Sequence, residues 1–298
     1  MINSELPHLS IGEQKRIAAR FGQANLCWKA VRLHCLDEEK EPISGAFASG
    51  FIRRDSDGHR YLYTAWHVVA GYGSPRRIEM PPPGKQRQRR SFLRIQMQDS
   101  KVTHHQFGRG ESIGGLRQID LPLYESSGSP IWFQEPEQNA HDLNNIGLRV
   151  PRNVDAVRIR LPEDTPVPST TEIIDEFSSL GAWPTDRILI VGYPYGYSIG
   201  GEDEPFAVVI TRHVAGRELP NPHYLLIDGP GTPGMSGAPI FMMDDSDHPR
   251  LIGLYSGVIR PDAGQVRQQE LSAALGECFL LWHICGENGP GLSQLGSP

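Results

Sequence analysis

Short alternating apolar runs, each closed by turn residues, constrain the fold of this 298-residue chain more than any other feature. Apolar and polar residues alternate as they do on a strand that buries one face, and Gly, Pro or Asp ends each run. The 32 Gly and 25 Pro residues suit a chain with many turns and oppose a helical bundle. In the first half, the runs that indicate strands are 27–35, 47–53, 61–69, 92–97, 131–133 and 154–161.

The second half has the same character. Its strand candidates are 187–192, 206–214, 224–228, 238–242 and 251–258. Strands do not alternate regularly with long helices, so a parallel α/β sheet is not expected. No repeat of fixed period is visible, and the length allows one large core or two of medium size. The sequence therefore predicts an all-β protein with two antiparallel barrels.

The domain organisation follows from changes in this pattern. Residues 1–26 are expected to form an N-terminal helical extension, because Ser10-x-x-Glu13 resembles a capping box and apolar residues follow at helical spacing. The first barrel is predicted over 27–162 and the second, with the C-terminal segment, over 185–298. The segment 163–184 is acidic, contains Pro and has few core residues, as a connector between two halves would.

Charge and hydropathy exclude several classes of partner. The net charge of −6 and the pI near 6.0 do not favour binding to nucleic acid or to an anionic membrane surface. The chain contains neither an N-terminal apolar run of the secretory kind nor a stretch of about 18 apolar residues. A cytoplasmic protein without a membrane or nucleic-acid partner is the expectation.

The four cysteines lie in two pairs near opposite ends of the chain, which is sparse for a disulfide-stapled secreted domain. Reduced thiols are expected. Neither pair has the tight Cys-x-x-Cys spacing of a zinc site, although His34 adjoins Cys35 and His283 lies between Cys278 and Cys285. No metal and no cofactor are predicted.

A serine among glycines lies just before an apolar run in the second half, where residues 234–239 read GMSGAP. Glycines let the main chain turn tightly, so that backbone N–H groups can converge on a developing oxyanion. Ser236 is the candidate nucleophile, and the N–H groups of Gly234 and Ser236 are the candidate oxyanion donors. Pro239 opposes the immediate helix that follows the nucleophilic serine of an α/β-hydrolase.

Two further residues could activate that serine. His67 ends the apolar run 61–67, and an imidazole with an ordinary pKa of about 6.5 can accept a serine proton and return it to a leaving amine. Asp155 opens a strand whose alternating positions are otherwise apolar. A carboxylate there could fix the tautomer of the histidine and stabilise its protonated form. Asp120 is the rival acid, although Pro122 disrupts the strand expected after it.

Taken together, TAWH at 64–67, DAV at 155–157 and GMSGAP at 234–239 resemble the three signatures of trypsin-like serine peptidases, in the same order. ASGFI at 48–52 and VGYP at 191–194 are similar to strands of bacterial members, so the likeness spans about residues 43–260. The resemblance implies two antiparallel β-barrels of the six-stranded type. It also implies a catalytic triad of His67, Asp155 and Ser236.

The resemblance also suggests substrate-binding residues. Pro230 resembles the floor of the primary specificity pocket, and Gly231 beside it is a further candidate binding residue. Tyr255, Ser256 and Gly257 resemble the strand that pairs with substrate backbone and lines this pocket. Many secreted relatives carry an aspartate before the serine, which pairs with a newly cleaved N-terminus. Met235 stands here instead, so that route of activation is not expected. Because Pro230 is uncharged, specificity for Lys or Arg is not expected either.

The leading functional interpretation is a serine endopeptidase acting on protein or peptide substrates through an acyl-enzyme at Ser236. The alternative is a non-catalytic or latent protein-recognition module that keeps the peptidase fold. An esterase with the same triad is a third possibility, since the nucleophile is common to both reactions. A regulatory protein partner is also expected, because uncontrolled cleavage inside a cell would be harmful.

Overall fold

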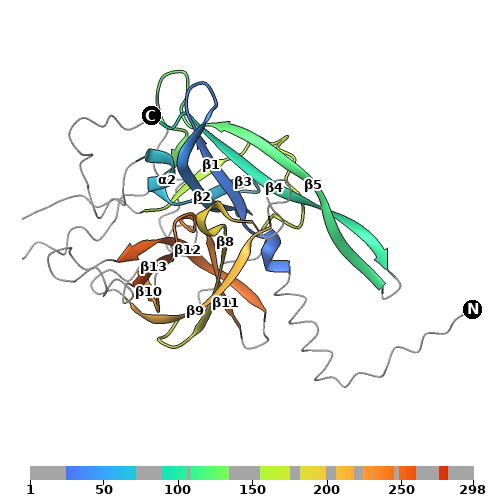
Figure 1. The fold of residues 1–298 in the computed structure, drawn as a ribbon, viewed down its shortest axis with the longest axis vertical. Helices are drawn as coiled ribbons and strands as arrows, with labels where there is room; N and C mark the ends of the chain where they lie inside the picture. The colour runs from blue at the N-terminus through green and yellow to red at the C-terminus, as the bar shows by residue number, and fades with distance from the viewer. Residues whose placement is uncertain are drawn as a thin grey trace, which may run out of the picture.

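A computed structural model describes residues 25–71, 89–105, 108–133, 155–174, 182–198, 206–217, 224–229, 231–244, 248–259 and 275–280. Within them the chain is mostly β, with two antiparallel sheets and only short helical turns (Figure 1). The helical pieces are η1 (Leu26–Trp28), α2 (Trp66–Ala70) and η3 (Pro194–Gly196). The predicted helix between Ser10 and Asn25 falls on residues outside these ranges, apart from Asn25 at its end.

The first sheet contains the strands of the N-terminal half. Its spatial order is β5-β4-β1-β2-β3-β7-β6, and every neighbouring pair is antiparallel. The strands are β1 (Val31–Leu36), β2 (Pro42–Arg54), β3 (Arg60–Thr64), β4 (Phe92–His105), β5 (Gly108–Pro122), β6 (Trp132–Phe133) and β7 (Val157–Arg160). Strands β4 and β5 extend beyond the rest of the sheet as a two-stranded ribbon (Figure 1).

The second sheet closes on itself as a barrel of six strands, in the order β10-β13-β12-β11-β8-β9. Its strands are β8 (Arg187–Gly192), β9 (Val208–Arg217), β10 (Tyr224–Ile227), β11 (Pro239–Met243), β12 (Pro249–Ile259) and β13 (Leu275–Leu280). All of its neighbouring pairs are antiparallel as well. Closure leaves no unpaired edge strand around the barrel, although single strands extend past their neighbours.

The prediction of an all-β chain with antiparallel sheets is confirmed, but the two sheets differ in form. The second closes as a barrel, whereas the first is a seven-stranded sheet. Within the described ranges its end strands β5 and β6 do not pair with each other. The physical reason lies at the two ends: β5 leaves the sheet with β4 in the long ribbon, and β6 is only two residues long.

A buried cluster joins the two halves of the chain. Phe51 and Tyr63 of the first sheet stack with ring centroids 5.1 Å apart, and the same cluster contains Tyr193 and Leu254 of the second half. Each sheet also has its own apolar core. The segment predicted to be the connector contributes as well, since Ile173 exchanges backbone hydrogen bonds with Ile52 and Arg54 on β2. The two sheets are therefore packed against one another rather than loosely tethered.

Three of the four cysteines, which were predicted to be reduced thiols, lie in the described residues. Cys27, Cys35 and Cys278 are free thiols, and Cys35 and Cys278 are buried in the separate cores of the two sheets. Burial raises the pKa of both buried thiols. Cys285 lies outside the described residues. None of the helices found in the described ranges is long and apolar enough to cross a membrane.

Candidate active site

His67 lies in the first turn of α2, immediately after the end of β3. Ala65 precedes the helix in an extended conformation, and the last turn ends at Gly71 with a left-handed φ of 74°. The His67 side chain is 22% exposed, so its ring is open to the surface on one side. Arg90 donates hydrogen bonds to the carbonyl oxygens of His67 and Val68, which satisfies acceptors of this short helix.

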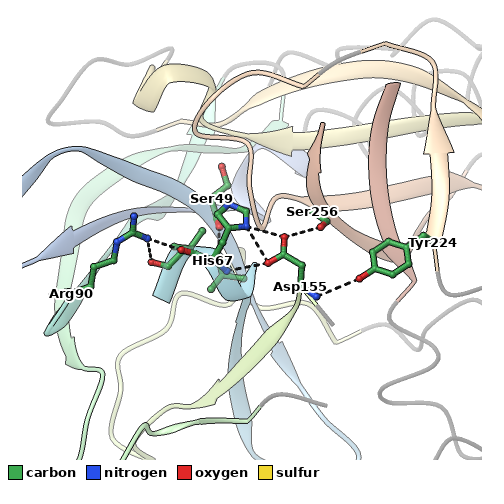
Figure 2. Close-up of polar contacts among 8 residues, drawn as sticks. Ser49, His67, Arg90, Asp155, Tyr224 and Ser256 are labelled. Carbon is green, nitrogen blue, oxygen red and sulfur yellow. Dashed lines mark hydrogen bonds and ion pairs between the residues drawn. The ribbon is translucent and has the colours of Figure 1, made fainter. Parts of the chain in front are cut away.

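Asp155 reaches His67 because its strand pairs with the strand that leads to the histidine. Thr64 at the end of β3 stands opposite Val157 at the start of β7, so the residues just outside these strands meet. The Asp155 carboxylate lies 2.9 Å (Oδ2) and 3.1 Å (Oδ1) from His67 Nδ1. Asp155 Oδ1 also accepts the backbone N–H of His67 at 3.0 Å (Figure 2).

The Asp155 carboxylate is almost completely buried, with 1% of its side chain exposed, and it needs donors to offset the loss of water. His67 supplies two, and the Ser256 hydroxyl supplies a third at 2.9 Å from Oδ2. An Nδ1–H held by this carboxylate leaves the other ring nitrogen, Nε2, with its lone pair free. His67 is therefore oriented to accept a proton at Nε2.

Ser256 owes its direction to an irregularity in β12. The register with β13 shifts between Tyr255, which pairs with Cys278, and Gly257, which pairs with Glu277. One extra residue on one strand is a β-bulge, a device that re-aims a side chain. The sequence had suggested Ser256 as a substrate-binding residue. Its side chain is 1% exposed and donates to Asp155 Oδ2, and the substrate-binding role of Ser256 stays a prediction.

Asp120, the rival acid, lies elsewhere in the first sheet. Arg94 Nε and Nη2 donate to its two carboxylate oxygens at 2.8 and 2.9 Å, across the β4–β5 pair. These hydrogen bonds hold the pKa of Asp120 below its ordinary value. Of the two acids considered, Asp155 is the one that contacts His67.

Ser236 lies in a turn that is docked on the first sheet. Its carbonyl oxygen accepts the backbone N–H of Ser49 on β2 at 3.0 Å. The next residue, Gly237, has a φ of 84°, and an added Cβ would lie only 2.3 Å from Ser49 O and Thr64 Oγ1. The serine turn thus packs directly on the end of β3 that leads to His67. No hydrogen bond joins Ser236 to His67 in this structure, and Ser236 is half-buried.

The predicted oxyanion donors occupy the same turn. The carbonyl oxygen of Pro233 accepts the backbone N–H of Tyr195, on the η3 side of the turn. In a trans peptide the C=O and N–H point in opposite directions, so the Gly234 N–H points away from Tyr195. Within the described chain, neither Gly234 N–H nor Ser236 N–H donates to a backbone carbonyl. Both donors are therefore uncommitted to internal backbone pairing.

The Ser49 side chain bonds to this turn. Its role was not identified from the sequence. Its buried hydroxyl donates to Gly234 O at 2.7 Å and accepts the Tyr193 N–H at 2.9 Å. Tyr224 was missed too, although its hydroxyl accepts the backbone N–H of Asp155 at 3.4 Å (Figure 2). Such contacts join segments more than 60 residues apart, and no local sequence pattern reports them.

The remaining predicted binding residues fall into three cases. Tyr255 is 1% exposed, and its hydroxyl accepts the backbone N–H of Gly231 at 2.7 Å. Gly257 pairs with Glu277 on one side and has open space where a side chain would be. Pro230 lies outside the described residues.

Met235, between the two oxyanion donors, packs into the apolar core of the barrel and is 1% exposed. The turn is thus anchored by an apolar side chain. In the part of the chain that is described, no group of three or more His, Cys, Asp or Glu side chains could hold a metal ion.

Comparison with known proteins does not identify a family for this chain. No family model matches it, and the search of curated proteins finds no significant match.

Proposed function

We propose that this protein is a serine endopeptidase of the trypsin-like kind, with His67, Asp155 and Ser236 as its triad. One observation carries the proposal: a buried carboxylate, 88 residues away in sequence, holds Nδ1 of a partly exposed histidine beside a glycine-flanked serine turn. The burial of the Asp155 carboxylate sets this pair apart from the exposed His213–Asp228 pair. A histidine whose Nδ1 is held in this way can act as the general base for a serine.

The trypsin-like fold is part of the proposal. In support, the histidine and the acid come from the first antiparallel sheet, whereas the serine comes from the second sheet, a closed six-stranded barrel. The Ser256 hydroxyl, delivered by the barrel, bonds to the acid of the first sheet. These contacts support a site that draws its residues from both sheets.

The proposed reaction proceeds through an acyl-enzyme. Ser236 Oγ attacks the carbonyl carbon of the scissile peptide while its proton passes to His67 Nε2. The N–H groups of Gly234 and Ser236 stabilise the oxyanion. His67 then protonates the leaving amine as the C–N bond breaks. Water, deprotonated by His67, attacks the acyl-enzyme, and His67 returns the proton to Ser236 as the acid product leaves.

Substrate backbone would pair with the end of β12. Residues 257–259 bond to β13 on one side, whereas β11 begins at Pro239, opposite Leu254, and does not reach them. No described strand pairs with their other edge. An extended peptide could add there as a further strand, with main-chain hydrogen bonds that are independent of its sequence. This edge favours a peptide substrate over a small ester.

The test is labelling of the purified protein with a fluorophosphonate probe, followed by mass mapping of the adduct. We expect one adduct, on Ser236, that Ser236→Ala abolishes and His67→Ala reduces at least about 100-fold in rate. Peptide and ester substrates, compared on the same samples, separate a peptidase from an esterase. Absence of labelling in folded protein would contradict the proposal.

A latent or non-catalytic recognition module is the second candidate, and one observation favours it. Ser236 and His67 share no hydrogen bond in this structure. Such bonds are often long in unliganded enzymes and shorten with substrate. A module that only binds would leave Ser236 unlabelled while Ser236→Ala still captured the same partner as wild type. A latent enzyme would become labelled once the partner is added.

A further inference from the structure

The ring of Tyr255 lies between two glycines: Gly231, in the segment before the serine turn, and Gly276 on β13. A Cβ added to Gly231 would lie 2.1 Å from Tyr255 Cζ, and one added to Gly276 would lie 3.1 Å from Cε2. Real Cβ atoms do not approach other heavy atoms as closely as the first of these. The two glycines therefore leave room for the aromatic ring, and the ring fills the space between them.

Two further contacts fix the ring. The Tyr255 hydroxyl accepts the Gly231 N–H at 2.7 Å, and the side chain is 1% exposed within the barrel core. The backbone of Tyr255 is also fixed, because its N–H donates to Ala238 O and its carbonyl accepts the Gly237 N–H, both at 2.8 Å. The backbone of Tyr255 is thus fixed, and turning the ring aside would break the hydrogen bond between its hydroxyl and Gly231 N–H.

The same space is where a substrate side chain would have to go, if the proposed function is correct. A peptide whose carbonyl meets the Gly234 and Ser236 N–H groups, and whose backbone pairs with residues 257–259, directs the side chain before the scissile bond inward. It then points between the 231–233 segment and the start of β13. Gly231 and Gly276 stand on these two sides. Tyr255 occupies the gap between them.

We propose that Tyr255 closes the primary specificity pocket, so that this enzyme cleaves after glycine or alanine and rejects larger side chains. The inference rests on the proposed function and names its substrate class. The cavity beside the ring has a volume of only about 20 Å³, and Tyr255, Gly231, Thr232 and Met235 are among the residues that line it.

The experiment compares cleavage of a peptide library, varied at the residue before the scissile bond, by wild type and by Tyr255→Val. Wild type should favour Gly and Ala over Leu and Phe by roughly 100-fold in kcat/KM, the scale on which a shaped pocket discriminates. Tyr255→Val should raise the ratio of Leu to Ala cleavage at least about tenfold. Tyr255→Phe keeps the ring and should retain the wild-type preference.

Phe241→Val is the matched control, since Phe241 is a buried aromatic residue of the same barrel that does not line the pocket. It should leave the preference unchanged. Equal or better cleavage by wild type after Leu or Phe would overturn the inference, even if Tyr255→Val did not fold. Fluorophosphonate labelling reads the nucleophile independently of the pocket. If the enzyme is labelled but prefers large residues, only the inference that Tyr255 closes the pocket is refuted. If the protein is not labelled, the proposed function itself is refuted.

Discussion

At the residue scale, the decisive feature is the set of donors around Asp155. The carboxylate receives the backbone N–H and Nδ1–H of His67 and the hydroxyl of Ser256. A buried carboxylate that is satisfied by three donors is held in one orientation, and the histidine is held with it. The geometry of the His67–Asp155 pair is therefore fixed without any bound ligand.

Replacing Asp155 tests this directly. Asp155→Asn keeps the shape of the side chain but removes its charge, so His67 loses the partner that fixes its tautomer and stabilises its protonated form. We expect kcat/KM to fall by about 10⁴-fold with little change in fold. Steady-state cleavage of the best library peptide measures it. Asp120→Asn, the other acid considered, should keep wild-type activity at neutral pH, and a matching loss there would contradict the assignment.

At the scale of elements, the serine turn depends on glycines whose backbone touches the first sheet. Gly237→Ala would combine a left-handed φ of 84° with a Cβ 2.3 Å from Ser49 O. The conformational strain alone costs about 1–2 kcal/mol, and the contact adds to it. We expect a lower unfolding midpoint in urea and a loss of labelling at Ser236. Gly216→Ala is the control, because a Cβ on Gly216 meets nothing within 4 Å. If both variants lost the same stability and the same labelling, the losses would not come from the contact between the serine turn and the first sheet.

The β4–β5 pair offers a pH-dependent prediction. Arg94 lowers the pKa of Asp120, so the pair stabilises the fold above the ordinary carboxyl pKa of about 3.9. That contribution is lost as the pH falls through the lower, folded-state value. Because both side chains are partly exposed, we expect Asp120→Asn to cost about 1 kcal/mol or less at pH 7. Urea unfolding at several pH values should show the difference shrinking in acid. A difference that grows in acid would contradict this sign.

How far the sequence predicts this architecture differs between elements. Strand positions and turns come from local alternation, and the order of His67, Asp155 and Ser236 from three short motifs. The bulge that turns Ser256 toward Asp155 depends on the register between β12 and β13. The space that the Tyr255 ring fills depends on Gly231 and Gly276, which lie on other segments. The unclosed first sheet depends on where β4 and β5 leave it. These features are tertiary, so alternation within one segment cannot report them.

At the scale of the whole molecule, the two sheets share one buried cluster. Leu254 on β12 is 0% exposed and belongs to the same cluster as Phe51 and Tyr63 of the first sheet. A core that spans both halves couples their unfolding.

Leu254→Ala should therefore destabilise both halves together, by about 2–5 kcal/mol, which is the usual cost of such a cavity. Hydrogen exchange resolved by segment measures this, with β3 reporting the first sheet and β11 the second. Both strands should lose protection by the same factor. Protection lost in β11 but kept in β3 would mean that the halves unfold independently.

The Ser49 hydroxyl, which holds Tyr193 and Gly234 at once, has a consequence for how the protein could be assayed. Ser49 lies on the first sheet, and its hydroxyl bonds to the serine turn of the second half. Thermal unfolding of the turn should therefore also separate the two sheets. Inactivation temperature and melting temperature should coincide. A compound that binds at Ser236 should then raise the melting temperature of the protein. Candidate inhibitors could therefore be ranked by the shift in melting temperature, before any substrate of this protein is known.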